Sequence, residues 1–181
     1  MTAVESNERV EGANSATADL EASRKRASEA RFRFIGPPRA VRVVGRRLWI
    51  PAKPRKALGQ DVLVVAGPST GELRLFPADV GIRFMNRLLE AANTIAGAEW
   101  GEAIWLIAAY AERVLVTKSG YLSIPKGVWE VAQLDDDADL VLVSLGDRLG
   151  LMRRTDFVRR TKKRSAKQHV SDIQEKVPGV Y

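Results

Sequence analysis

The sequence contains no cysteine and only one histidine in 181 residues. Without cysteine, disulfide bonds, zinc sites with thiolate ligands and catalysis by a thiol are excluded. The histidine, His169, has no serine or carboxylate cluster near it in the sequence, so it does not indicate acid–base or nucleophilic catalysis. No glycine-rich phosphate-binding motif with its lysine occurs. We therefore expect that the protein is not an enzyme and that it needs no cofactor.

Long apolar runs are also absent. Residues 1–30 contain no apolar segment that would serve as a signal peptide, and no later run is long enough for a membrane helix. Because residues 1–30 carry few large apolar side chains, we predict a disordered tail there. Residues 158–181 are predicted to form a second tail, basic and partly disordered. We expect a cytoplasmic, nucleoid-associated protein with no membrane partner.

The one dense acidic run is DDDAD, residues 135–139. It lacks the ligand spacing and the glycine of a calcium-binding loop. We therefore interpret it as a solvated acidic loop and predict no metal site.

Positive charge is what the sequence has in excess. Lys and Arg number 29 against 22 Asp and Glu, which gives a net charge of +7. From residue 31 to residue 60 every charged side chain is basic. Such a bias favours an anionic partner, and nucleic acid is the common one.

Around this basic segment, the pattern predicts a hairpin, a short helix and a second hairpin. AVRVVGRRLWIP reads as two strands around a turn at Gly45, because β-branched residues flank the glycine and Pro51 cannot extend a ladder. PAKPRKALG, residues 51–59, opens with proline and ends with glycine, which suits a helix of about two turns. DVLVVAG and ELRLF follow as two further strands.

The same order returns later in the chain, with RVLVTKSGYLSIP, KGVWEVAQL and ADLVLVSLGDRLGLMRRTDF. The steps Ile50-Pro51 and Ile124-Pro125 lie about 74 residues apart, which indicates an internal duplication. We place one unit at 31–77 and the other at 113–157. Each unit is too small to bury its own apolar face, so the two must share one core.

Residues 78–112 between the two units are predicted to be connecting helices. Ile82, Met85, Leu88, Leu89, Ala92 and Ile95 recur at helical spacing in the first helix. The second, EWGEAIWLIAAYAERV, is apolar around most of its circumference and is expected to be buried. We assign Trp100, Trp105 and Tyr110 to core packing.

Together, the strand ending Arg-x-x-Ile-Pro, the helix x-x-x-Arg-x-x-Leu-Gly and the closing strand pair resemble the SpoVT-AbrB swapped-hairpin DNA-binding fold. The tandem arrangement is similar to the MraZ family of bacterial transcriptional regulators, over roughly residues 39–157. The resemblance implies an α+β fold in which two pseudo-repeated hairpin-helix-hairpin units form a double-psi, swapped-hairpin AbrB-like barrel. It also implies a homo-oligomer.

The resemblance is uneven between the two units. In the first, Arg47 falls on the arginine before the Ile-Pro step, and Arg55 and Lys56 fall on the basic helix positions that commonly contact DNA in the family. The second unit has Tyr121, Trp129 and Glu130 at those places. The aspartate that MraZ proteins typically carry four residues before the arginine is replaced by Val43 and by Thr117. Only the first unit is therefore predicted to offer strong phosphate contacts.

The predicted function is binding of double-stranded DNA by a transcriptional regulator. We expect the cations to neutralise phosphates while arginines near Gly45 reach base edges; the predicted residues are Arg42, Arg46, Arg47, Lys53, Arg55 and Lys56. In the alternative interpretation these side chains are solvated residues that deter pairing at a sheet edge.

Two other functions remain open for the same fold. One is an antitoxin whose tails bind a protein partner. The other is a non-specific nucleoid or RNA-binding protein, although RNA readers usually expose aromatic side chains and only Trp49 lies near the basic turn.

Overall fold

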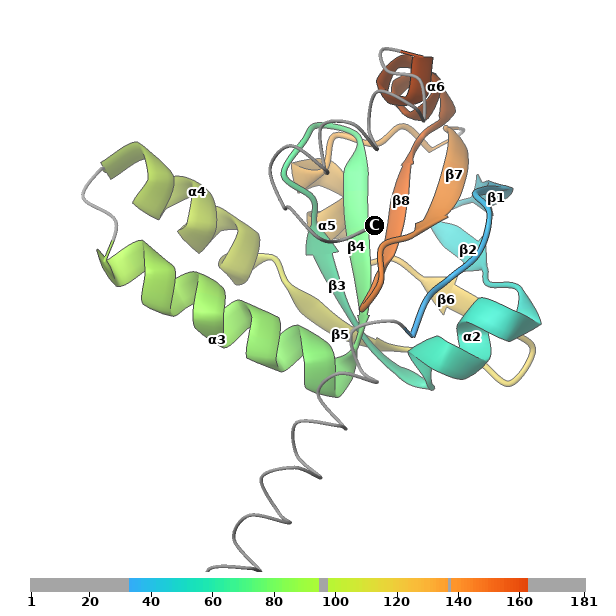
Figure 1. The fold of residues 1–181 in the computed structure, drawn as a ribbon, viewed down its shortest axis with the longest axis horizontal. Coiled ribbons are helices and arrows are strands. Elements are labelled where there is room, and N and C mark those ends of the chain that lie inside the picture. The colour runs from blue at the N-terminus through green and yellow to red at the C-terminus, as the bar shows by residue number, and fades with distance from the viewer. Residues whose placement is uncertain (1–32, 95–97, 137, 163–181) are drawn as a thin grey trace, which may run out of the picture.

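The computed structural model describes residues 33–94, 98–136 and 138–162. Within them, eight strands form one antiparallel sheet that curls into a nearly closed barrel, accompanied by five helices (Figure 1). The strands are β1 Arg39–Val44, β2 Arg47–Trp49, β3 Asp61–Ala66, β4 Glu72–Pro77, β5 Glu112–Leu115, β6 Tyr121–Ser123, β7 Asp139–Ser144 and β8 Leu149–Arg153. The helices are α2 Ala52–Leu58, α3 Ala78–Thr94, α4 Ala98–Ala109, α5 Lys126–Val131 and α6 Arg154–Lys162.

The predicted order of strands and helices is confirmed in both units. In the second unit, however, β5 and β6 pair with β3 and β2 of the first unit and form no ladder with each other. Helix α2 begins directly after Pro51 and α5 directly after Pro125, because proline fixes a backbone angle that suits the start of a helix. One boundary differs: α6 begins at Arg154, ahead of the predicted end of the second unit, and continues to Lys162. Residues 1–32 and 163–181, which include nearly all of both predicted tails, lie outside the described residues.

Strands of the two units pair with each other in the sheet. Strand β1 of the first unit pairs with β7 of the second, and β5 of the second pairs with β3 of the first. Strand β2 pairs with β6, and β4 pairs with β8. Neither unit closes a sheet by itself, so the barrel exists only when both are present.

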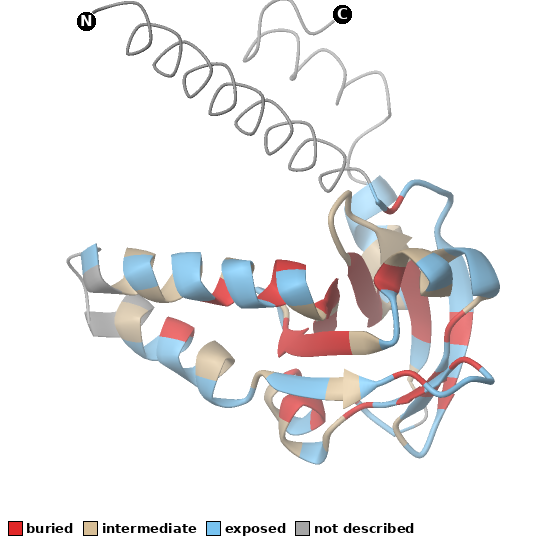
Figure 2. Ribbon diagram, turned by 90° about the horizontal axis from the view of Figure 1, so that it is seen from below, coloured by how far each residue is buried: buried red, intermediate tan, exposed pale blue. Residues whose placement is uncertain are grey.

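The interior of the barrel is therefore a shared core. Ile50 and Ile124, the residues before the two prolines, are both buried in one apolar cluster with Leu48 and Leu122. Their backbones are held in an equivalent way, because the Ile50 amide donates to the Gly120 carbonyl at 2.9 Å and the Ile124 amide donates to the Arg46 carbonyl at 2.8 Å. Figure 2 shows that the buried residues concentrate in the strands of the barrel.

Helices α3 and α4 form a hairpin that packs against the outer face of β3 and β4 and projects away from the barrel (Figures 1 and 2). Leu63 and Phe76 on the sheet pack with Val80 and Met85 on α3. Phe84 of α3 stacks on Phe76 with ring centroids 4.9 Å apart. Of the predicted apolar residues of α3, Met85 is buried, as expected, whereas Ile82 is exposed.

The prediction that α4 is buried all round is wrong. Trp105 is 62% exposed and Tyr110 is 43% exposed, whereas Ile104 is buried. Because the hairpin projects from the barrel, α4 meets α3 on one side and solvent on the other. The side chain of Trp100 lies outside the described part of α4.

In the described ranges, no helix has both the length and the apolar character needed to cross a bilayer.

Candidate nucleic-acid interface

The six predicted cations lie in two groups, one on the β1–β2 hairpin and one on α2. Arg46 and Arg47 occupy the turn between β1 and β2 and the start of β2, with Arg42 on β1. The three remaining cations, Lys53, Arg55 and Lys56, lie on α2, which follows the end of β2. A strand of three residues spans about 10 Å. The two groups are thus separate along one edge of the fold, and all six side chains are exposed or half-exposed.

The turn between β1 and β2 presents Arg46 at its tip. Val44 and Arg47 are paired across the hairpin, so the turn consists of Gly45 and Arg46 alone. Both have positive φ, 54° and 62°. Two such residues match the twist of a hairpin, but the second position favours glycine or asparagine, and an arginine there costs on the order of 1 kcal/mol. Strained residues of this kind concentrate at functional sites.

The side chain of Arg55 on α2 reaches the second unit. The guanidinium of Arg55 lies against Gly120, and a Cβ atom at Gly120 would collide with Nη1 of Arg55. Gly120 also has a φ of +92°, which disfavours other residues. Because Gly120 of the second unit has no side chain, the guanidinium of Arg55 of the first unit can lie against its backbone.

This contact leads to a prediction about Gly120. Gly120→Ala is expected to destabilise the fold by about 1 kcal/mol because of its backbone angle. It is expected to weaken DNA binding less than Arg55→Ala does, because the end of the Arg55 side chain moves aside and keeps its charge. Gly59→Ala is the control, since Gly59 also has positive φ but a Cβ there meets nothing within 4 Å. Thermal melts and DNA titrations of the three variants check this. If Gly120→Ala and Gly59→Ala change DNA affinity equally, the position of Arg55 is irrelevant.

None of the six predicted cations forms an ion pair with the described carboxylates. Elsewhere ion pairs are common, and they include every arginine of β4, β5, β8 and α6, namely Arg74, Arg113, Arg153, Arg154, Arg159 and Arg160. On β5, for example, the hydrogen bond from Arg113 holds the pKa of Asp61 below its usual value. The six cations are therefore available to an anion in a way that most of the described arginines are not.

Arg42 differs from the other five because the fold brings an acidic residue beside it. Asp139 of β7 lies directly across from Arg42 in the β1–β7 register. Its carboxylate is already paired with Arg154 at 3.3 Å. Arg42 therefore keeps its charge free, although the field of Asp139 weakens its attraction for a phosphate.

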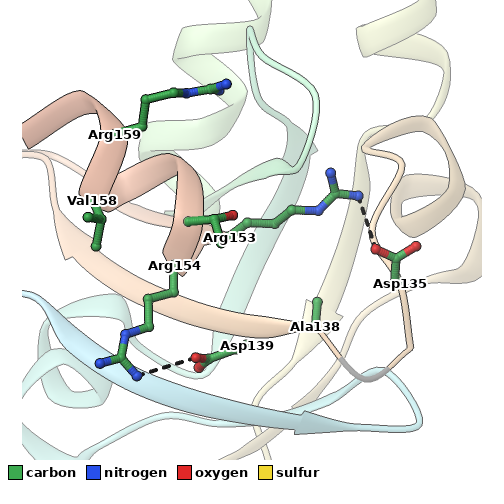
Figure 3. Close-up of a pocket in the computed structure, with 8 residues that line it drawn as sticks. Asp135, Ala138, Asp139, Arg153, Arg154, Val158 and Arg159 are labelled. Atoms are coloured by element: carbon green, nitrogen blue, oxygen red, sulfur yellow. Dashed lines mark hydrogen bonds and ion pairs between the residues drawn. The ribbon is translucent and has the colours of Figure 1, made fainter. Parts of the chain in front are cut away.

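Two carboxylates of the acidic run at 135–139 are exposed and form ion pairs with arginines. Asp135 pairs with Arg153 at 3.2 Å, and Asp139 pairs with Arg154, as Figure 3 shows. These residues line a pocket of about 590 Å³ under α6. Among the described side chains there is no group of three or more metal-ligating residues, and His169 and Asp137 lie outside them.

In the second unit, the three residues that replace the cations differ in burial and in their contacts. Trp129 is buried in the shared core, and Glu130 pairs with Lys126 of its own helix at 3.5 Å. Tyr121 is 41% exposed, on the strand next to Trp49. The sequence interpretation placed exposed aromatic character at Trp49 alone and so missed Tyr121. The alternation of Leu122 and Ile124 with Tyr121 and Ser123 is the signal that would have found it.

Comparison with known proteins adds no relative to this description. No protein-family model matches the chain, and a search of curated proteins finds no match.

Proposed function

We propose that this protein binds double-stranded DNA and acts as a transcriptional regulator of the MraZ/AbrB type. The observation that carries the proposal is the set of six cations on the β1–β2 turn, β1 and α2 that pair with none of the described carboxylates. The proposal also takes the barrel to be a swapped-hairpin AbrB-like barrel of two pseudo-repeats. The pairing of β1 with β7 and of β5 with β3, each between the two units, supports that assignment.

The two groups of cations suit two kinds of contact. Arg46 stands at the tip of a tight turn, where a guanidinium can enter a groove and donate to guanine in a bidentate manner. The three cations of α2 lie on a short, exposed helix and suit contacts to the phosphate backbone. If all six cations neutralise phosphates, a plot of the logarithm of the association constant against the logarithm of the salt concentration is expected to have a slope of about −5.

The experiment is a fluorescence anisotropy titration across a salt series. The duplex taken from upstream of the protein's own gene is compared with a scrambled duplex of equal length. A regulator is expected to prefer the native duplex by at least about a hundredfold at physiological salt. Equal binding of the two duplexes would instead identify a non-specific nucleoid protein, and no binding to either at low salt would remove the proposal.

Self-association belongs to the same proposal. A single basic face binds weakly at physiological salt, and several copies would place several faces on one duplex. Sedimentation velocity on the full chain, with and without DNA, is expected to show a homo-oligomer. A monomer in both conditions would contradict this part of the proposal.

A further inference from the structure

The outward face of β2 and β6 carries two aromatic side chains next to the unpaired arginines. Trp49 of β2 and Tyr121 of β6 are directly opposite each other in the register. In each strand the middle residue, Leu48 or Leu122, is buried in the core, so the residues on both sides of it face outward. Directly opposed residues on neighbouring strands have Cβ atoms about 5 Å apart. Trp49 and Tyr121 are therefore adjacent on one surface.

Both aromatic side chains are partly exposed, and the Tyr121 ring is partly covered by the guanidinium of Arg47. Trp49 is 48% exposed and Tyr121 is 41% exposed, on a sheet whose inner residues are almost completely buried. Val44 of β1, opposite Arg47, adds a further exposed apolar side chain on the neighbouring strand. A solvated sheet face normally carries polar side chains, so exposed apolar residues gathered on one face indicate a binding surface.

Positive charge lies directly beside these rings. The guanidinium of Arg47 stands over the ring of Tyr121, with Cζ 5.5 Å from the ring centroid. Arg46 precedes it at the tip of the turn, and Arg42 lies on the outward face of β1 because Val41 and Val43 face inward. A ligand that stacks on the rings would thus meet cations within the length of one nucleotide.

We propose that Trp49 and Tyr121 form a stacking platform for the unpaired bases of a single-stranded nucleic acid, whose phosphates are held by Arg46 and Arg47. Aromatic side chains on adjacent strands of an open sheet face, with arginines beside them, have the chemistry that binds successive unstacked bases. Bases of an intact duplex are stacked on each other and cannot lie flat on such rings. This inference rests on the proposed DNA-binding surface and adds a second class of nucleic acid to it.

The experiment measures binding of the full chain to three fluorescent ligands: a 15-nucleotide oligothymidine, the matching oligouridine and a duplex of the same length. The unmodified protein is expected to bind the single strands, with quenching of tryptophan emission. Comparison of the two single strands shows whether unpaired DNA or RNA is preferred. Trp49→Ala and Tyr121→Ala are each expected to lower single-strand affinity about tenfold while changing duplex affinity less than threefold.

Three variants serve as controls. Trp49→Phe keeps a stacking ring and is expected to retain most single-strand affinity. Trp105→Ala removes a tryptophan that is more exposed than Trp49 from α4, outside the sheet, and is expected to leave single-strand affinity unchanged. Arg46→Ala with Arg47→Ala is expected to weaken both single-strand and duplex binding.

The outcomes separate this inference from the proposed function. Duplex binding without single-strand binding overturns the platform and leaves the DNA-binding proposal intact. Equal losses from Trp49→Ala and Trp105→Ala, with melting temperatures unchanged, also overturn it. Failure to bind any of the three ligands removes the DNA-binding proposal itself.

Discussion

Replacing Arg46 and Arg47 together with alanine is expected to weaken binding to duplex DNA by at least tenfold and to make its salt slope shallower by about 2. Both side chains are unpaired, and both lie at the turn that the proposal places against DNA. The loss has two sources, because two phosphate contacts or base contacts disappear together with two units of positive charge. The measurement is the anisotropy titration in a salt series.

The fold is expected to survive this double substitution. The Arg46 contact that the barrel uses is its backbone carbonyl, which accepts from the Ile124 amide and is kept in alanine. The guanidinium of Arg47 contacts the exposed ring of Tyr121 and no carboxylate. Melting temperature and far-UV circular dichroism should therefore stay close to those of the unmodified protein.

A matched control removes two arginines elsewhere. Arg83 and Arg87 are exposed on α3, which belongs to the projecting helical hairpin, and Arg83 is already paired with Asp79 at 3.0 Å. Arg83→Ala with Arg87→Ala lowers the net charge by the same amount and is expected to change DNA affinity less than threefold. If both double variants weaken binding equally, overall charge and not the turn controls the interaction.

Glu72→Ala is expected to lower the free energy of unfolding by about 3 kcal/mol. Glu72 lies on β4 with its side chain 1% exposed, and it pairs with Arg74 at 2.7 Å and with Arg160 of α6 at 3.0 Å. Removing the carboxylate leaves the partly buried guanidinium of Arg74 without its counter-charge and breaks a link between α6 and the barrel. For a chain of this length the melting temperature should fall by about 6–12 °C.

The control for Glu72 is an exposed ion pair. Asp79 and Arg83 are both more than half exposed, so Asp79→Ala should cost less than about 1 kcal/mol. Chemical denaturation of both variants beside the unmodified protein gives the two values. Similar values for Glu72→Ala and Asp79→Ala would show that the buried carboxylate contributes no more than a surface pair.

Glu72 also illustrates what a sequence pattern leaves hidden. In ELRLF, Glu72 and Arg74 alternate with buried leucines and read as the solvent side of a strand. The structure instead covers this face of β4, because Arg160 reaches Glu72 from a helix that begins after the last strand. Burial of Glu72 depends on a contact between residues far apart in the chain, and local alternation carries no information about it.

Much of the fold follows from local sequence. Alternating β-branched residues, the glycine turns and the two Ile-Pro steps determined both hairpin-helix-hairpin units, because the conformation of a strand, turn or helix start depends on a few neighbouring residues. Composition likewise excluded thiol chemistry and identified the unbroken basic segment. The candidate cations were therefore readable from the sequence alone.

Only the tertiary structure decided how these parts combine. The pairing of β1 with β7 and of β5 with β3, the position of Asp139 beside Arg42 and the contact of Arg55 with Gly120 each join residues of different units. The same holds for Trp49 and Tyr121, which come from different strands and meet because β2 pairs with β6. The physical reason is that long-range pairing depends on the free energy of the whole chain. A single segment therefore does not specify which other segment it will pair with.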